Sequence, residues 1–395
     1  MTHTDILRTA FAAVVMTCIL MPNAEAEELV IRKEIPFSGR DAVYNSANRT
    51  LYALNCPDGC ELWAYDVSAG ELLPPPIDWL NEEAGPLFVN PLANVIYIRD
   101  DVDGFRAVDG STHEEVGGFG AGGVHINDHH VVAVHERANR MYIAGRRVFF
   151  DGQIRKEHVI NAYEADTLKF VASASISDTE SFPALAVDRK TGRLYLNSNP
   201  IVGGGFVTVF DGTTLAQLAS IELSNYAQVA FSNRLEINSI TRRLYAYGVG
   251  NDAVDIIDLD GNTIINTVTV PECHKSAVSL RRGYAYVTSS DDHEIYVINR
   301  HNEIDTSVAV GNGMGLSRLM VNQLTGSLYA THGSSDFTGF AVISARDHRV
   351  TQEIEMTVTP DSTLVLRNAV FAIPSHSYPT SVFKVQLPRI QAIGP

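Results

Sequence analysis

One short strand with an aromatic residue recurs along the chain, and this repeat constrains the fold more than any other feature. Its aromatic residues follow one another at spacings of 45, 45, 53, 50, 41, 43 and 42 residues. An apolar strand and a tight turn precede each copy, as in LAVDRKTGRLY and LMVNQLTGSLY. An alternating strand that ends in an acidic or amide residue follows, and a further β-rich strand closes most units. The aromatic positions are Tyr52, Tyr97, Tyr142, Tyr195, Tyr245, Tyr286, Tyr329 and Phe371.

Each repeat unit is predicted to be a four-stranded antiparallel meander, because its strands are short, β-branched and aromatic, and because Gly, Asn and Asp mark its turns. A single sheet of this kind cannot bury both of its faces. Radial stacking of several sheets buries them, and a period of 40–50 residues is typical of β-propellers. No segment keeps a 3.6-residue apolar period, so helix should be nearly absent. We therefore expect one all-β propeller of about eight copies of a four-stranded blade.

The two ends of the chain predict how the ring closes. Residues 28–36 (ELVIRKEIP) form a strand that precedes the first inner strand near Asp41 to Tyr44. The last unit ends at SVFKVQLPRI with little chain after it. The N-terminal strand should therefore complete the final blade. Eight blades are favoured, and seven are possible if one weak unit is an embellishment.

The "LY" strand, the turn before it and the following "VIDxxG"-like strand resemble the YVTN-type propeller repeat of bacterial exported proteins. The motif is also similar to that of the heavy chain of quinoprotein amine dehydrogenases. This resemblance covers essentially all of the chain after the N-terminus. Two units depart from it, since Tyr97 lacks the preceding Arg and Phe371 replaces Tyr. The resemblance implies an exported propeller and says little about chemistry, because propellers carry many functions.

The N-terminus reads as an export signal. Arg8 provides a positive region, Thr9 to Met21 are apolar, and Ala24-Glu25-Ala26 gives a small-x-small cleavage pattern. The apolar run is too short to cross a bilayer as a helix, which needs about 20 residues. We expect residues 1–26 to be a signal peptide and residues 27–395 to be the propeller domain, without a membrane span after cleavage. The expected location is the periplasm or the exterior.

The charge of the chain argues against nucleic acid as a partner. The formal net charge is −16, and removal of residues 1–26, with one Arg and two acidic residues, leaves −15. Nucleic-acid binding depends on phosphate neutralisation by a basic surface, and the sequence has no basic stripe.

Four cysteines are present, of which Cys18 lies in the signal segment. Cys56 and Cys60 frame a CPDGC loop, and Cys273 stands alone. In an oxidising compartment a Cys56–Cys60 disulfide is the natural interpretation. Free thiols or a metal contact remain alternatives.

Histidines are predicted to gather on one rim of the propeller. The loops between second and third strands, and those between blades, share that rim. Eight histidines map to it: His125, His129, His130, His158, His274, His293, His332 and His376. The opposite rim receives His113, His135, His301 and His348.

The His125–His130 segment, HINDHH, is the leading candidate for a metal site. It places His125, Asp128, His129 and His130 within six residues, and imidazole and carboxylate are common ligands of divalent transition metals. His274 and His332 are weaker candidates. The competing interpretation is a set of ordinary polar loops, because no two of these motifs have a spacing that requires shared coordination.

The long insertion after Tyr142 is a candidate binding loop. It carries Arg146, Arg147, Phe149 and Phe150, and a basic-aromatic loop over a rim can serve as a lid for a substrate or partner. An ordinary surface excursion is the alternative. The stretches VGGFGAGGV and VGGGF lack the strand-to-helix setting of a phosphate loop.

Three functions are compatible with these features. The first is a non-catalytic scaffold that presents its His-rich rim to a periplasmic protein partner or a small ligand. The second is a metal-assisted propeller enzyme, such as a lyase or lactonase, that uses rim histidines. The third is the propeller subunit of an amine-oxidising quinoprotein, which would need a separate redox subunit because this chain has no haem-binding element.

Overall fold

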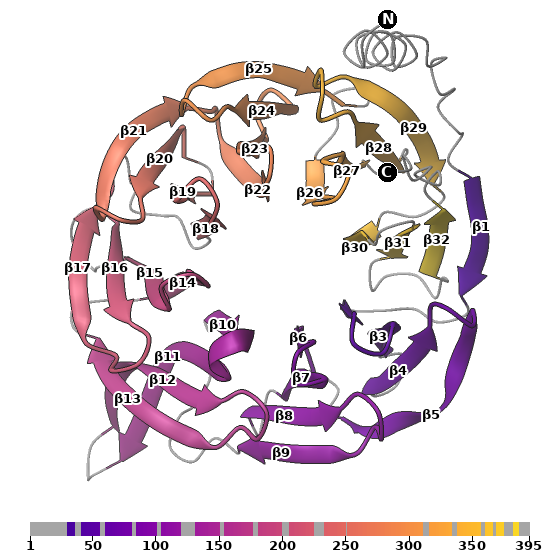
Figure 1. Cartoon of the computed structure of the whole chain (residues 1–395), viewed down its shortest axis with the longest axis vertical. Coiled ribbons are helices and arrows are strands. Elements are labelled where there is room, and N and C mark those ends of the chain that lie inside the picture. Colours follow the sequence, from indigo (N-terminus) through magenta and orange to yellow (C-terminus); the bar gives the residue numbers. More distant parts are fainter. Residues whose placement is uncertain are drawn as a thin grey trace, which may run out of the picture.

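The strands of the chain form sheets that are arranged in a closed ring (Figure 1). The computed structural model describes residues 30–35, 41–55, 60–80, 84–100, 104–119, 131–150, 154–176, 181–199, 205–224, 233–249, 251–310, 316–333, 338–356, 360–365, 369–374 and 382–386. These residues form four-stranded antiparallel sheets, which are simple meanders of consecutive strands except for the sheet that joins the two ends of the chain. One 3₁₀ turn, η1 (Glu136–Ala138), is the helical element in this described part. No helix in it is long and apolar enough to cross a membrane.

Blades 1 to 4 occupy the first half of the chain. Blade 1 contains β2 (Ala42–Asn45), β3 (Thr50–Asn55), β4 (Cys60–Asp66) and β5 (Glu71–Leu80). Blade 2 contains β6 (Leu87–Asn90), β7 (Val95–Asp100), β8 (Gly104–Asp109) and β9 (Glu115–Phe119). Blade 3 contains β10 (Val131–His135), β11 (Arg140–Phe150), β12 (Ile154–Glu164) and β13 (Phe170–Ile176). Blade 4 contains β14 (Ser181–Val187), β15 (Arg193–Asn199), β16 (Phe206–Asp211) and β17 (Gln217–Glu222).

Blades 5 to 7 repeat the same order. Blade 5 contains β18 (Asn233–Asn238), β19 (Arg243–Gly248), β20 (Ala253–Asp258) and β21 (Thr263–Thr269). Blade 6 contains β22 (Cys273–Ser279), β23 (Tyr284–Ser289), β24 (Glu294–Ile298) and β25 (Ile304–Ala309). Blade 7 contains β26 (Leu316–Val321), β27 (Leu328–Gly333), β28 (Thr338–Ile343) and β29 (Val350–Met356).

The last sheet joins the two ends of the chain. It contains β30 (Pro360–Val365), β31 (Ala369–Pro374) and β32 (Val382–Gln386), and its outermost strand is β1 (Val30–Ile35). β1 pairs antiparallel with β32, from Val30 opposite Gln386 to Ile35 opposite Val382. The N-terminal strand therefore closes the ring, and Figure 1 shows β1 beside β32.

This closure corrects the expectation of about eight copies of one four-stranded repeat. Seven blades are each built from four consecutive strands, from β2–β5 through β26–β29. The remaining sheet is composite, with three C-terminal strands and one strand from the opposite end of the chain. The count of eight complete copies was wrong, because the Phe371 unit supplies only three strands of its sheet. The prediction that the N-terminal strand completes this sheet is confirmed.

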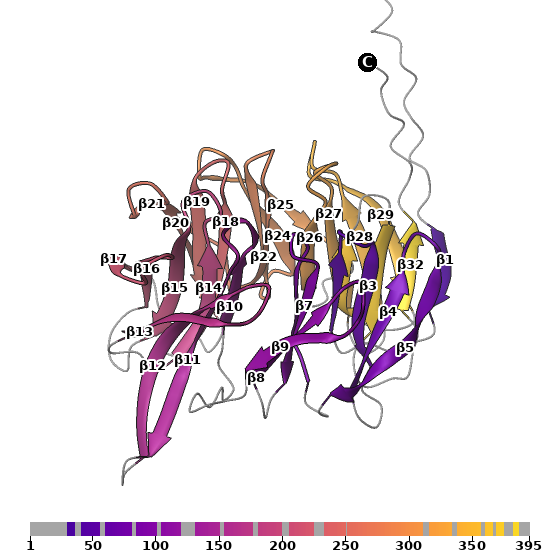
Figure 2. The same ribbon diagram turned by 60° about the horizontal axis from the view of Figure 1, so that its bottom comes forward.

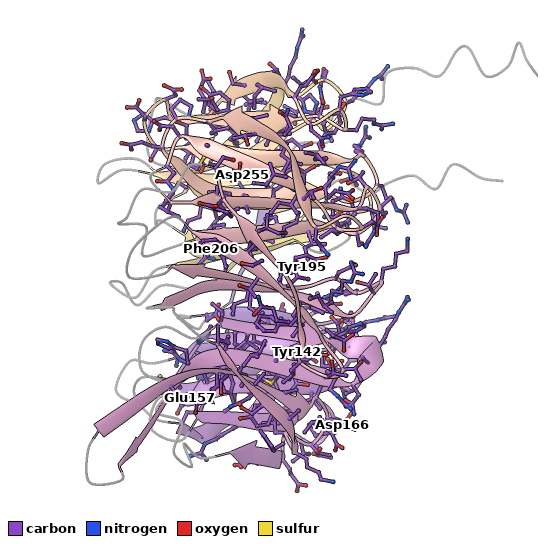
Figure 3. The ribbon with its side chains drawn as sticks, turned by 90° about the vertical axis from the view of Figure 1, so that its left-hand side faces the viewer. Tyr142, Glu157, Asp166, Tyr195, Phe206 and Asp255 are labelled. Atoms are coloured by element: carbon purple, nitrogen blue, oxygen red, sulfur yellow. The ribbon has the colours of Figure 1, made fainter. Side chains whose placement is uncertain are left out.

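The repeat tyrosines occupy the second strand of their blades and pack between neighbouring sheets. The exposed fraction of Tyr52, Tyr97, Tyr142, Tyr195, Tyr245, Tyr286 and Tyr329 is between 0% and 4%. Tyr142 and Tyr195 are labelled on successive blades in Figure 3. Apolar clusters join adjacent blades, for example Leu54 of blade 1 with Ile96 of blade 2. Burial of such side chains stabilises the ring by about 1.5–3 kcal/mol each.

Hydrogen bonds from four of these tyrosines link one blade to the next. The hydroxyl of Tyr142 donates to the carbonyl of Gly212 at 2.9 Å, in the turn between the third and fourth strands of blade 4. Equivalent bonds run from Tyr52 to Gly110, from Tyr97 to Ala165 and from Tyr195 to Leu259. The sequence motif therefore carries both the apolar packing and a polar link between blades.

Candidate binding site

The inner strand of each contiguous blade ends in a buried polar residue that organises the following turn. In blade 2 the side chain of Asn90 accepts a hydrogen bond from the backbone N–H of Leu92 at 3.1 Å. Such a bond from residue i+2 defines an Asx turn, which allows a tight change of direction. The same bond forms from Ala47 to Asn45, Lys190 to Asp188, Ile240 to Asn238 and Leu324 to Asn322. Because the first residue is buried, the residue two positions later lies at the surface.

These outward residues lie on the inner strands' turns at one rim of the ring, and we call them the inner-rim crown. They lie five residues before each repeat tyrosine, and all are exposed. Leu92, Ile240 and Leu324 are 68%, 61% and 54% exposed, a large exposure for apolar side chains. The full crown is Ala47, Leu92, Arg137, Lys190, Ile240, Arg281 and Leu324. It combines four apolar and three basic residues and contains no carboxylate.

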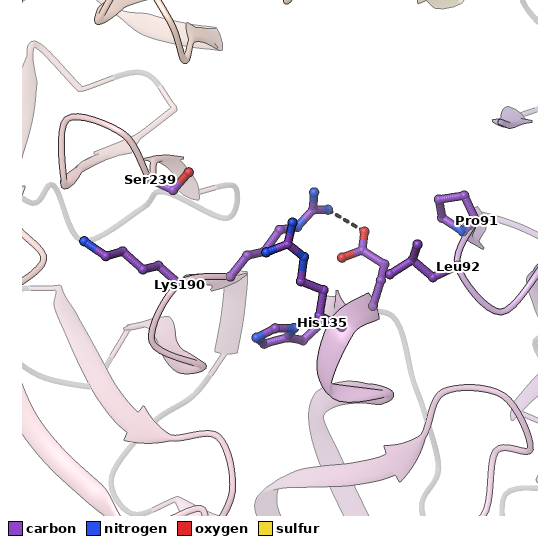
Figure 4. Close-up of a pocket in the computed structure, with 8 residues that line it drawn as sticks. Pro91, Leu92, His135, Lys190 and Ser239 are labelled. Atoms are coloured by element: carbon purple, nitrogen blue, oxygen red, sulfur yellow. Dashed lines mark ion pairs between the residues drawn. The ribbon is translucent and has the colours of Figure 1, made fainter. Parts of the chain in front are cut away.

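A pocket of about 570 Å³ lies beside part of this crown. Turns of blades 2, 3, 4 and 5 line it, through Pro91, Leu92, His135, Glu136, Arg137, Arg189, Lys190 and Ser239. Figure 4 shows the side chains of these turns around the opening. Three cations and one carboxylate give the lining a positive balance, although the chain as a whole carries −16. The pocket therefore differs in charge from the rest of the surface.

One ion pair orders the basic side of the pocket. Arg189 of blade 4 contacts Glu136 of η1 at 2.7 Å, and Figure 4 marks this pair. η1 itself forms because His135 replaces the usual Asn or Asp, and the His135 Nδ1 accepts from the N–H of Ala138 at 3.4 Å. Arg137 and Lys190 remain exposed on either side. These two cations are therefore available to a partner with negative charge.

A buried ion pair fixes the floor of the neighbouring turn. Arg242 of blade 5, only 8% exposed, contacts the fully buried Asp188 of blade 4 at 2.7 Å and Asp260 at 2.7 Å. Burial alone would raise the pKa of Asp188, but hydrogen bonds from Thr191 and Arg242 outweigh it, and the pKa lies below its ordinary value. The carboxylate therefore stays charged and holds blades 4 and 5 together beneath Lys190.

The residues of the predicted metal site lie largely outside this description. His125, Asp128, His129 and His130 are not among the described residues, so that site stays a prediction. The described residues contain no group of three or more His, Cys, Asp or Glu that could hold a metal ion. His274 and His332 lie in the inner strand of blade 6 and the second strand of blade 7.

The predicted rim position of His332 was wrong. This side chain lies within β27 and is 1% exposed, and burial lowers its pKa. His274 lies within β22, half-buried, with its Nδ1 3.4 Å from the carbonyl oxygen of Leu316. His158 was expected at the end of a loop and is found in β12. These histidines lie in strands because the strands of the structure are longer than the positions of the turn residues in the sequence suggest.

The predicted binding loop is instead a β-hairpin. Arg146, Arg147, Phe149 and Phe150 belong to β11, which pairs with β12 as far as Phe150 opposite Ile154. Figure 2 shows this hairpin projecting beyond the rim on the side away from the crown. The pairing is regular because Val148, Phe149 and Phe150 favour strand structure. The insertion of the sequence is thus an extension of two blade strands.

The described residues do not test the predicted disulfide. Cys60 begins β4 and is 2% exposed. Cys56 lies outside the described residues, so the Cys56–Cys60 bridge stays a prediction. Cys273 is a buried free thiol, and burial raises its pKa to about 12. It is therefore an unreactive packing residue.

Comparison with known proteins supports the fold and does not assign a family. No protein-family model matches the sequence, and no curated protein matches it. Solved structures do match it. The chain is a β-propeller.

Three of these structures illustrate the range of the likeness. Sqt1 from Saccharomyces cerevisiae matches with a TM-score of 0.67 and 10% identity, over 92% of this chain and 99% of that one. The computationally designed Ika8 protein gives 0.65 and 12%, over 91% and 99%. BamB from Moraxella catarrhalis gives 0.64 and 10%, over 91% and 100%. At such low identity, these matches show the fold alone.

The sequence analysis missed the crown, although a signal was present. The residue five positions before each repeat tyrosine is variable, and in three blades it is a large apolar residue within a predicted turn. That pattern is visible once the repeats are aligned on their tyrosines. The analysis concentrated on histidines and on the longest loop, which lie elsewhere.

Proposed function

We propose that this protein is a binding scaffold that docks a partner on its inner-rim crown. One observation carries the proposal: a pocket of about 570 Å³ opens beside the exposed apolar and basic side chains of the crown. Exposed apolar residues that cluster on one face mark interaction surfaces. The partner surface that fits combines acidic with apolar side chains, because Arg137 and Lys190 stand between Leu92 and Ile240.

The rigidity of the ring supports this role. The turns that carry the crown are fixed by buried Asn or Asp side chains and by the Arg242–Asp188 ion pair. A partner that docks there meets side chains held by an ordered backbone, so less conformational entropy is lost on binding. Scaffolds gain affinity from such preorganised surfaces.

The proposed location is the periplasm. The export signal in residues 1–26 and the resemblance of the repeat to YVTN-type exported propellers support it. Edman sequencing of the protein from a periplasmic fraction should begin at Glu27. Recovery of the intact N-terminus in the cytoplasm would contradict the proposed export.

Affinity capture with matched variants tests the docking face. The test variant is L92D/I240D/L324D, which places carboxylates on the crown. The control is F170D/L218D/I265D, which changes equally exposed apolar residues on the outermost strands β13, β17 and β21. We expect a periplasmic protein retained by the wild type and by the control to be lost with the crown variant. Equal retention by all three proteins would contradict the proposal.

The His-rich rim remains the alternative docking face. His129 and His130 lie outside the described residues, so this alternative rests on the sequence alone. Metal analysis of the purified protein tests it, with His129→Ala and His130→Ala as the variants. A stoichiometric transition metal that both substitutions remove would favour a metal-dependent role over the scaffold proposed here.

A further inference from the structure

Blade 3 carries a hairpin whose two strands continue past their neighbours. Among the described residues, β10 pairs with β11 no further than Ala144, and β13 pairs with β12 no further than His158. β11 and β12 stay paired with each other as far as Phe150 opposite Ile154. The end of this hairpin therefore projects from the ring, as Figure 2 shows.

The projecting segment, residues 146–157, combines basic with apolar residues. It contains four basic and two acidic residues, a net charge of +2, whereas the whole chain carries −16. The register places Phe150 and Ile154 opposite each other at the far end of the strands. Phe149 lies one position nearer the blade, opposite Arg155. The basic residues of the segment are Arg146, Arg147, Arg155 and Lys156.

The acidic residues do not balance this positive charge. Glu157 lies at the blade end of the segment, opposite Arg147, and the hydroxyl of Ser175 in β13 donates to its carboxylate. Figure 3 labels Glu157 on this hairpin. Asp151 belongs to the connection 151–153, which lies outside the described residues. The other three cations lie opposite His158, Phe149 and Val148 in the register, so no acidic residue faces them across the strands.

We infer that this hairpin docks the protein on the surface of a membrane that contains anionic lipids. Lys and Arg residues near such a surface are attracted to it, and each strengthens binding about fivefold. Aromatic and apolar side chains beside them enter the boundary between the headgroups and the acyl chains. The hairpin supplies both, with its apolar pair at the far end and its cations within four residues of that pair along the strands.

The negative charge of the ring does not prevent this contact. The pair of Phe150 and Ile154 lies four residues beyond His158, the last residue of β12 that pairs with β13 in the described part. This separation is about 13 Å at roughly 3.3 Å per residue. The Debye length at physiological ionic strength is about 8 Å. Salt therefore screens most of the repulsion between the ring and a lipid surface that the hairpin end touches.

A lipid surface suits this segment better than a strand of another protein does. Cations on the edge of a sheet oppose pairing with a further strand, and natural proteins use them for that purpose. A lipid surface needs no backbone pairing and gains from each cation. The hairpin also lies on the side of the ring away from the crown (Figure 2). The inference therefore does not rest on the proposed partner docking, and either can fail while the other holds.

Flotation of the protein with lipid vesicles tests the inference. The chain used starts at residue 27, so it contains every described strand and lacks the apolar segment of residues 9–21. The vesicles contain phosphatidylcholine alone, or phosphatidylcholine and phosphatidylglycerol in a ratio of about three to one. We expect the wild type to float with the anionic vesicles and not with the neutral ones. The bound fraction should fall at high salt.

Two variants each remove one property of the hairpin. Arg155→Gln/Lys156→Gln removes two cations and should weaken binding to the anionic vesicles about tenfold or more. Phe149→Ser/Phe150→Ser removes the aromatic residues and should also weaken binding about tenfold or more.

Each variant has a control that makes the same change elsewhere. Arg346→Gln/Arg349→Gln removes two exposed cations from the turn between β28 and β29, on the opposite rim. Phe170→Ser/Leu218→Ser removes two exposed apolar residues from the outermost strands β13 and β17. Both controls should bind the anionic vesicles as the wild type does.

Several results would overturn the inference. Failure of the wild type to float with anionic vesicles would do so, and so would equal binding by the wild type and both hairpin variants. Equal flotation with neutral vesicles would contradict recognition of anionic lipids. A wild type that binds no vesicle but captures a soluble protein, which the hairpin variants lose, would make the hairpin a protein-docking element. Circular dichroism of each variant is recorded first, and a variant with a lost β-sheet signal is replaced by Arg146→Gln/Arg147→Gln, for which the same tenfold criterion applies.

Discussion

Blades 1 to 4 and blades 5 and 6 use the same tyrosine differently. In the first group the hydroxyl donates to a turn carbonyl of the next blade, as in the Tyr142–Gly212 bond. In the second group the buried hydroxyls of Tyr245 and Tyr286 have no hydrogen-bond partner among the described residues. The aromatic side chains contribute apolar packing to stability in both groups, because all of these tyrosines are buried.

The turns that face the second group of tyrosines differ locally. In blade 6 the turn that faces Tyr245 is one residue shorter, since the N–H of Asn299 bonds to the carbonyl of Glu303, whereas Asp211 bonds to Ala216 in blade 4. In blade 7 the carbonyl of Ala345 accepts from Arg282 Nη1 at 3.3 Å. The packing motif is the same in both groups, because the tyrosines remain buried.

The comparison separates two roles of one polar group in a repeated fold. In blades 1 to 4 the tyrosine hydroxyl ties one blade to the next. In blades 5 and 6 the hydroxyl is buried without this bond. We therefore expect removal of the hydroxyl to lower stability in the first group and not in the second.

The largest expected effect lies at the boundary between the two groups. Arg242→Ala leaves the fully buried Asp188 without its guanidinium and should lower the free energy of unfolding by about 3 kcal/mol or more. Arg243→Ala is the matched control, because the Arg243–Asp258 pair is partly exposed and should cost at most about 1 kcal/mol. Urea denaturation followed by tryptophan fluorescence measures both. Equal losses in the two variants would mean that the buried pair does not join the halves.

Removal of the tyrosine hydroxyls should change the free energy of unfolding by a smaller amount, and by different amounts in the two groups of blades. Tyr142→Phe and Tyr195→Phe each remove an inter-blade hydrogen bond and should lower stability by about 1 kcal/mol. Tyr245→Phe and Tyr286→Phe remove a buried hydroxyl without a partner and should leave stability unchanged or slightly higher. Urea midpoints of the four variants decide the matter. A loss in the second pair as large as in the first would break the distinction.

The sequence predicted the fold well because packing and turns repeat. The aromatic residues and the Gly, Asn and Asp turns predict strands, and the spacing predicts radial stacking. The strand predicted near the N-terminus correctly indicated that the last blade is composite. The number of repeats alone could not show that the last unit supplies only three strands. The extended hairpin at Arg146 was not predicted. Blade strands were expected to be short, so the extra residues after Tyr142 were assigned to a loop although their sequence favours strands.

The candidate sites were harder to predict because their positions depend on equivalence between blades. The exposed crown residues Leu92, Ile240 and Leu324 lie far apart in the sequence, and nothing marks them until the repeats are aligned on their tyrosines. His332 attracted attention as a metal ligand, yet a strand that reaches closer to the rim buries it. The residue type suggested chemistry, while burial decided whether the side chain was available.

The most direct test of this comparison measures the free energy of unfolding of Tyr142→Phe and Tyr245→Phe side by side. Tyr142→Phe should lose about 1 kcal/mol, because its hydroxyl donates to the carbonyl of Gly212. Tyr245→Phe should keep or gain stability, because its buried hydroxyl has no hydrogen-bond partner among the described residues. If both variants lose the same free energy, the two groups of blades do not differ in this bond.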